Sequence, residues 1–152
     1  MIKIENGLIT EFNIPGIKFA QDLIPKSNKL ARSQLPMKPQ YITLHNPASG
    51  RATAEDLTEY IDNYHGYKSW HLTIISTKAF QELPFIENGW HAGDGYNGPG
   101  NRISIALEIG EDEISENTAK VFVAYLMKEY NIPIENVKPH KHWSGKNCPA
   151  HT

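Results

Sequence analysis

The chain has 152 residues, enough for one domain with a buried core and too few for a second. Its formal net charge is -2 and no run of like charges occurs, which excludes a nucleic-acid or acidic-membrane partner held by charge alone. One cysteine rules out an internal disulfide, and no apolar run is long enough to cross a bilayer. Any binding function therefore depends on a local site.

The first segment, residues 1–21, is expected to form an N-terminal arm ahead of a single domain over residues 22–152. Its short apolar runs are broken by Gly7 and Pro15, which favours an extended segment or a short strand followed by a loop. We expect the compact part of the protein to begin near Met37.

The first half of the domain contains two predicted strands and a helix. Alternating apolar and polar residues predict a strand over 41–45. Thr53 is a good helix N-cap, and an apolar stripe at i, i+3, i+4, i+7 predicts a helix that ends at Gly66. Aromatic and β-branched residues predict a second strand over 70–75, with residues 79–83 as its hairpin partner.

The second half begins with a glycine-rich loop over residues 88–101, and a loop of this length in a compact domain is usually functional. Residues 103–110 alternate strictly, with large apolar side chains on one face and Ser104, Ala106 and Glu108 on the other. Two small residues and one carboxylate are typical of a strand that forms the floor of a pocket.

A second helix is predicted to start at Ser115, with its inner face formed by Ala119, Phe122, Val123, Leu126 and Tyr130. Residues 134–137 are expected to form one turn of helix. Strands that alternate with helices in this way indicate an α/β fold.

The segment Pro139–Pro149 concentrates metal-binding side chains: the only cysteine, Cys148, and two of the seven histidines, His140 and His142. Its glycine, serine and prolines predict a loop, and a loop can place a His and a Cys eight residues apart on one ion. A third ligand must come from elsewhere, and His45, at the end of a predicted strand, is the candidate.

Two histidines and one thiolate suit zinc and leave the fourth tetrahedral position for water, as in catalytic zinc sites. Spacing does not exclude the alternatives, because Cys148 could be a packed thiol and His45 a buried histidine with satisfied hydrogen bonds. Other histidines remain possible ligands on the same grounds: His65, His71, His91, His142 and His151.

A site of this kind is suited to hydrolysis of an amide or ester. Glu108, on a pocket-facing strand position, could act as general base, and a carboxylate in an apolar strand needs a partner or a function. Lys146 could stabilise a developing oxyanion, although alone it would be read as a solvated surface lysine.

Five segments resemble, in order and spacing, the zinc N-acetylmuramoyl-L-alanine amidases of phage endolysins and autolysins, the type related to the peptidoglycan recognition proteins. The similarity covers residues from about 22 to 149. The segments are Tyr41–Asn46, Ser69–His71, Trp90–Gly95, Asn101–Ile109 and Pro139–Pro149.

The resemblance implies a single α/β domain with a central mixed sheet flanked by helices, and zinc as the cofactor. It implies that His45, His140 and Cys148 are the zinc ligands. Glu108 would be the general base, and Lys146 would lie near the scissile carbonyl. The residues expected to grip the substrate or brace the groove are Trp70, His71, Trp90, His91 and Tyr96.

The implied partner is bacterial peptidoglycan, with no nucleic acid and no membrane insertion. Relatives continue into a wall-binding module, so we expect this chain to be part of a longer protein. No signal peptide is evident at Met1–Gly7, which predicts a cytoplasmic protein that reaches the wall on release. The alternatives are a peptidoglycan-binding module without activity and a structural zinc scaffold, which would need a fourth ligand such as His71 or His142.

Overall fold

A six-stranded mixed sheet forms the centre of the computed structural model, which describes residues 1–149. Neighbouring strands run parallel except for the antiparallel pair β5–β6. In spatial order the strands are β3 (Lys18–Gln21), β6 (Lys78–Gln81), β5 (Leu72–Ile75), β7 (Ser104–Ile109), β4 (Tyr41–His45) and β8 (Val137–Pro139). The expected central mixed sheet is confirmed.

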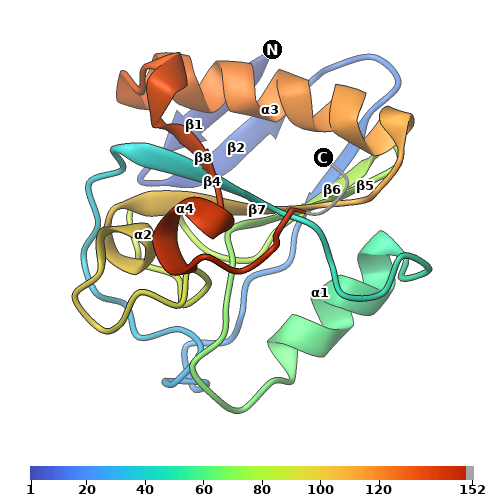
Figure 1. Ribbon diagram of the computed structural model, residues 1–152. Coiled ribbons are helices and arrows are strands. Elements are labelled where there is room, and N and C mark those ends of the chain that lie inside the picture. Colours follow the sequence, from blue (N-terminus) through green and yellow to red (C-terminus); the bar gives the residue numbers. More distant parts are fainter. Residues whose placement is uncertain (150–152) are drawn as a thin grey trace.

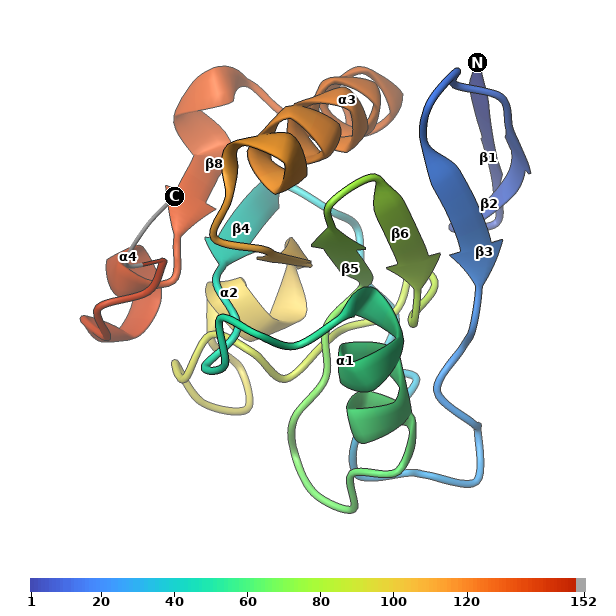
Figure 2. The ribbon, with the colours of Figure 1, turned by 90° about the vertical axis from the view of Figure 1, so that its right-hand side faces the viewer.

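Helices cover both faces of the sheet (Figure 1). One face carries the long helix α3 (Glu113–Tyr130) and the hairpin of β1 (Ile2–Glu5) and β2 (Leu8–Phe12). The other face carries α1 (Ala54–Asp62), α2 (Pro99–Arg102) and α4 (Lys141–Ser144), which are seen from the side in Figure 2. A single 3-10 turn, η1 (Ile134–Asn136), joins α3 to β8.

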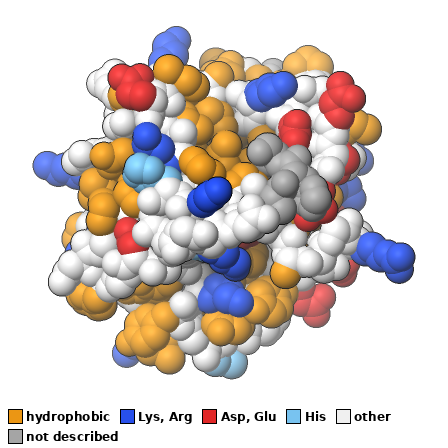
Figure 3. Space-filling view, in the orientation of Figure 1, with side chains coloured by type: hydrophobic (Ala, Val, Ile, Leu, Met, Phe, Trp, Pro, Cys, Tyr) orange, Lys and Arg blue, Asp and Glu red, His pale blue; other side chains and the backbone are white. Residues whose placement is uncertain are grey.

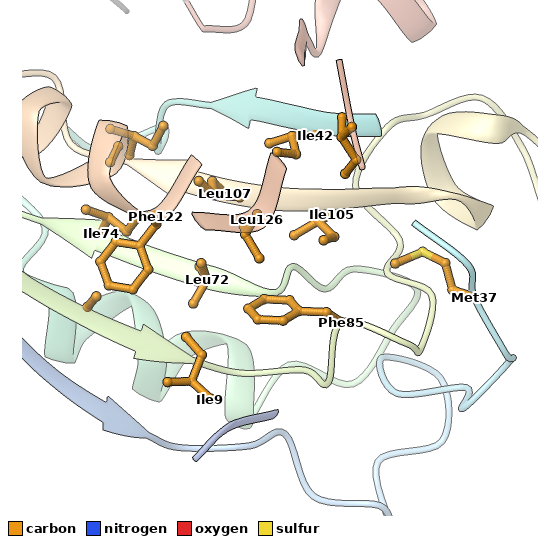
Figure 4. Close-up of a cluster of buried hydrophobic side chains, with 14 residues drawn as sticks. Ile9, Met37, Ile42, Leu72, Ile74, Phe85, Ile105, Leu107, Phe122 and Leu126 are labelled. Carbon is orange, nitrogen blue, oxygen red and sulfur yellow. The ribbon is translucent and has the colours of Figure 1, made fainter. Parts of the chain in front are cut away.

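The main core lies between the sheet and α3 (Figure 4). Alternate residues of the central strands point into it, including Leu72, Ile105 and Leu107, and they meet Phe122 and Leu126 of the helix. Each fully buried side chain of this size contributes about 1.5–3 kcal/mol of hydrophobic stabilisation. This layer fixes the sheet, and hence the positions of the side chains on its opposite face.

The opposite face of the sheet is polar where β4 and β7 lie side by side. Thr43 and His45 on β4 point away from the apolar residues of that strand, as alternation predicts. In the strand register His45 pairs with Glu108 of β7. The predicted alternation of residues 103–110 is confirmed, since Ile105, Leu107 and Ile109 lie in the main core and Glu108 does not.

Both long helices form as predicted, but one boundary of each differs. The helix α1 begins after Thr53, whose side chain forms a capping box with Asp56. It ends at Asp62, with Asn63 as its C-cap, rather than at Gly66. The helix α3 begins after Asp112 rather than at Ser115, because the Asp112 carboxylate accepts the Ser115 N–H at 2.8 Å.

The N-terminal segment is part of the compact fold, which therefore begins well before Met37. Ile9 of β2 is only 4% exposed, and β3 is an edge strand of the main sheet. The β1–β2 turn docks through Gly7, whose carbonyl accepts the Phe85 N–H at 2.7 Å. Gly7 has φ +77, and an added Cβ would lie 2.8 Å from Ile86, so glycine is required there.

The glycine-rich loop and the C-terminal segment also contain short helices that the sequence did not reveal. Residues 88–101 lead into α2, and residues 139–149 contain α4. Among the helices of residues 1–149, none has the length and apolar character needed to span a membrane.

Candidate metal centre

Three side chains that could hold a metal ion meet on the polar face of the sheet: His45, His140 and Cys148. One donor atom from each lies within 4.8 Å of the others, and all three side chains are buried. His45 ends β4, and His140 follows directly after the neighbouring strand β8. The structure therefore brings together the three residues that the family resemblance implies as zinc ligands.

The backbone explains how residues so far apart in the chain meet. The β4–β8 register pairs Leu44 with Pro139, and the His140 N–H donates to the Leu44 carbonyl at 3.3 Å. The chain then makes the turn of α4 and returns, and the Lys141 N–H donates to the Cys148 carbonyl at 3.0 Å. This closed turn carries the Cys148 thiol back over the end of β4.

Two further observations fit a metal-binding role for these three residues. The His45 Nδ1 atom lies 3.7 Å from the Cys148 sulfur. The His140 Nδ1 atom is buried and has no hydrogen-bond partner among residues 1–149. A buried nitrogen without a partner is costly unless something else binds it, so this atom fits a ligand role.

Burial sets the protonation of these groups. It lowers the pKa of His45 to about 3, with smaller contributions from His140 and Lys146, and it also lowers the pKa of His140. Both rings are therefore neutral at pH 7, the form that binds metals. Burial raises the pKa of Cys148, so the thiol keeps its proton until a cation displaces it.

His91 braces the first ligand directly. Its Nδ1 atom shares a hydrogen bond of 3.0 Å with Nε2 of His45, the ring nitrogen on the far side from the cysteine. The Asn101 side-chain oxygen accepts the backbone N–H groups of His91 and Ala92, both at 2.8 Å. The glycine-rich loop thus holds His91 in place, and His91 fixes the orientation of the His45 ring.

Replacing His91 by Ala is expected to weaken metal binding about 10–100-fold, because the His45 ring would lose the partner that orients it. Titration of the protein with metal against a competing chelator measures this affinity. The matched control is His142→Ala, since His142 is exposed and its ring packs against Trp143 rather than against His45. Equal affinities of the two variants would contradict the bracing role.

Glu108 lies beside the three donors, opposite His45 in the sheet. Its Oε2 atom is buried and has no hydrogen-bond partner among residues 1–149. Burial raises the pKa of Glu108 to about 8, although Lys146 and then Lys68 oppose this shift. A carboxyl group with a pKa near neutrality is well suited to accept and return a proton.

A cavity of about 1060 Å³ opens over the metal donors and Glu108. Trp70, Trp90 and Tyr96, the aromatic residues expected to grip the substrate, are among the residues that line it, and so are His91 and Lys146. Trp70 is anchored from behind, since its indole N–H donates to Thr73 Oγ1 at 2.8 Å and Thr73 in turn donates to the buried Glu82 carboxyl. Tyr96 is 58% exposed at the rim, whereas Trp90 is 7% exposed.

His71 is not among the residues that line this cavity, and of the two expected roles, gripping the substrate or bracing the groove, its contacts fit the second. The side chain is fully buried, its Nε2 donates to the Glu87 carbonyl at 2.7 Å, and its Nδ1 accepts the Ala106 N–H at 3.0 Å. Both nitrogens are committed to the backbone, which also removes His71 as a fourth metal ligand. His65 and His142 are exposed and do not line the cavity, and His151 lies outside the described residues.

Sequence reasoning missed one wall of the cavity. Tyr60 of α1 and the following residues Tyr67 and Lys68 also line it. Tyr67 packs edge-on against Trp90, with ring centroids 5.7 Å apart. The predicted apolar stripe of this helix includes Tyr60 but assigns it to the buried face, whereas Tyr60 is 45% exposed. The short segment after the helix carried no motif.

The family model described as N-acetylmuramoyl-L-alanine amidase, Amidase_2, matches residues 35–151. The chain belongs to this amidase family. This member is 44% identical over 140 residues to amidase CwlH of Bacillus subtilis (strain 168), covering 88% of this chain and 56% of CwlH. It is equally similar to amidase XlyA of the same strain, 44% over 140 residues, covering 88% of this chain and 46% of XlyA. The chain thus spans about half the length of these relatives.

Solved structures share the fold. The catalytic domain of XlyA matches with a TM-score of 0.82 at 44% identity, covering 88% of this chain and 91% of that domain. PlyL matches with a TM-score of 0.78 at 40% identity, covering 88% of this chain and 86% of the PlyL chain. The expected single α/β amidase domain is confirmed by these matches.

Proposed function

We propose that this domain is a zinc-dependent hydrolase that cleaves the amide between the lactyl group of N-acetylmuramic acid and L-alanine in bacterial peptidoglycan. The observation that carries the proposal is the group of His45, His140 and Cys148 with Glu108 beside it, in a member of an amidase family. An activity of this kind would act on the cell wall and weaken it, as in bacterial lysis.

Zinc is the ion that this donor set favours. Two imidazole nitrogens and one sulfur are borderline-soft ligands, which disfavour magnesium and calcium. The group formed by the described residues has three members, which suits a catalytic rather than a structural site. When bound, zinc supplies activation of water and polarisation of the scissile carbonyl.

Glu108 and Lys146 would perform the remaining steps. Glu108 would take a proton from the attacking water and deliver it to the departing L-alanine amine. Lys146, an exposed side chain on the cavity wall, would stabilise the negative charge that develops on the carbonyl oxygen. The cavity is large enough for an extended substrate, and its aromatic wall of Trp70, Trp90 and Tyr96 would pack against sugar and peptide.

Digestion of purified peptidoglycan tests this proposal. The protein with bound zinc should release new L-alanine amino groups and no new reducing sugar ends. A chelator should abolish the release, and added zinc should restore it. Tight retention on the wall without release would instead favour a binding module, and new reducing ends would indicate cleavage of the glycan strand.

A further inference from the structure

The cavity is electrostatically asymmetric. Among the described residues that line it, Lys68 and Lys146 are cationic and Glu108 is the one carboxylate. Figure 3 shows the face that carries α4, on which Lys and Arg side chains lie both near the middle and at the margins. A cavity of this charge attracts an anionic ligand.

The two lysines occupy different parts of the cavity. Lys146 lowers the pKa of His45, His140 and Glu108, so its charge lies close to the whole metal centre. Lys68 lines the cavity from the segment that follows α1, whereas His45 ends β4 and His140 follows β8. The two lysines therefore reach the cavity from different elements, and Lys68 comes from the one that carries none of the metal donors.

The Lys68 ammonium group is held in place in the absence of substrate. It donates to the Tyr60 hydroxyl at 3.1 Å and lies 4.9 Å from the ring centroid of Tyr64. One of its three hydrogens is used by Tyr60, and no acidic side chain among residues 1–149 forms an ion pair with it. The remaining hydrogens are available to a ligand, and little side-chain entropy would be lost on binding.

We propose that Lys68 is a substrate-binding residue that recognises a carboxylate of the stem peptide on the far side of the scissile amide. This inference rests on the proposed amidase function and adds to it a preference for one kind of peptide. An ammonium group held by Tyr60 and Tyr64 favours a carboxylate over a neutral carboxamide, because only the carboxylate adds an opposite charge to the hydrogen bond and forms an ion pair. The wall of α1 and the segment after it thus set specificity, while the β4–β8 side performs the reaction.

Two soluble muramoyl-L-alanyl peptides test the proposal. They differ only at the second peptide residue, which is isoglutamate with a free α-carboxylate in one and isoglutamine with a carboxamide in the other. The wild-type protein should cleave the carboxylate peptide with about tenfold higher kcat/KM. Lys68→Met should remove the preference through KM, and Lys68→Arg should keep most of it. Lys120→Met on α3, behind the sheet, is the matched control and should behave as wild type.

Binding separates this inference from the proposed reaction. Calorimetry measures the affinity of each peptide for the Glu108→Gln protein and for the Glu108→Gln, Lys68→Met double variant. Because neither protein is expected to cleave the peptides, the preference is measured without turnover. Binding that prefers the carboxylate in a protein that cleaves neither peptide would overturn the amidase function and support Lys68. The role of Lys68 would be overturned by either of two results. One is that proteins with Lys68 intact cleave and bind the two peptides equally, and the other is that the preference for the carboxylate peptide survives Lys68→Met.

Discussion

Glu108→Gln is expected to lower kcat/KM on peptidoglycan by about 100–10,000-fold and to leave metal affinity unchanged, the range typical of general acid–base catalysis. The amide has the shape of the carboxyl group but cannot take a proton from water. Glu108 shares its strand register with His45, yet it is not one of the three grouped donors. Its removal should therefore affect proton transfer and not the holding of the ion.

Parallel measurement of metal content and of released L-alanine amino groups checks both halves of this result. The control is Glu135→Gln, which makes the same chemical change at an exposed position in η1. An active Glu108→Gln protein would show that another group moves the proton. A variant that loses both metal and activity would place Glu108 among the ligands instead.

Cys148→Ser should abolish activity by removing metal binding. A serine hydroxyl keeps its proton at neutral pH and is a poor ligand, whereas a cysteine gives up its proton to bind zinc. We expect the metal affinity to fall by more than about 100-fold, beyond the loss typical of a residue that only orients a ligand. The loss should exceed that of His91→Ala.

Thermal unfolding provides a readout of Cys148→Ser that does not depend on catalysis. Zinc at about 1,000 times its Kd stabilises a protein by about 4 kcal/mol, which for a chain of this size raises the Tm by about 10 °C. The wild-type protein should show this rise and the variant should not, although both should have the same Tm in chelator. A full zinc-dependent rise in the variant would rule out Cys148 as a ligand.

Local sequence patterns predict the elements of this fold well. Strict alternation predicts β7, and the Thr53 cap with its apolar stripe predicts α1, because both patterns report which side of an element is buried. The same local patterns predict the first and last residues of the helices less well. Asp112 and Ser115 are both good caps, and the bond of the Ser115 hydroxyl oxygen to the Ser76 N–H, 39 residues away, is invisible in the local pattern.

The residues of the candidate site that belong to a sequence motif could be predicted. Contacts that form only when distant segments pack together could not. The resemblance selected His45, His140 and Cys148 from among the histidines, a choice that spacing alone left open. The contact of His91 with His45 and the position of Lys68 depend on how separate loops pack. His71 illustrates the same limit, since the resemblance did not reveal that both of its ring nitrogens bond to the backbone, to Glu87 and Ala106.

The separation of the donors along the chain affects when the site can form during synthesis. His45 and Cys148 are 103 residues apart in the chain. The strand that carries His45, β4, lies between β7 and β8, which are both synthesised much later. Contacts of such long range close slowly, because a large loop must lose its conformational freedom first. All six strands of the sheet precede Cys148 in the sequence. A nascent chain therefore has an incomplete donor set until the ribosome has passed residue 148, so the fold can assemble before the site is complete.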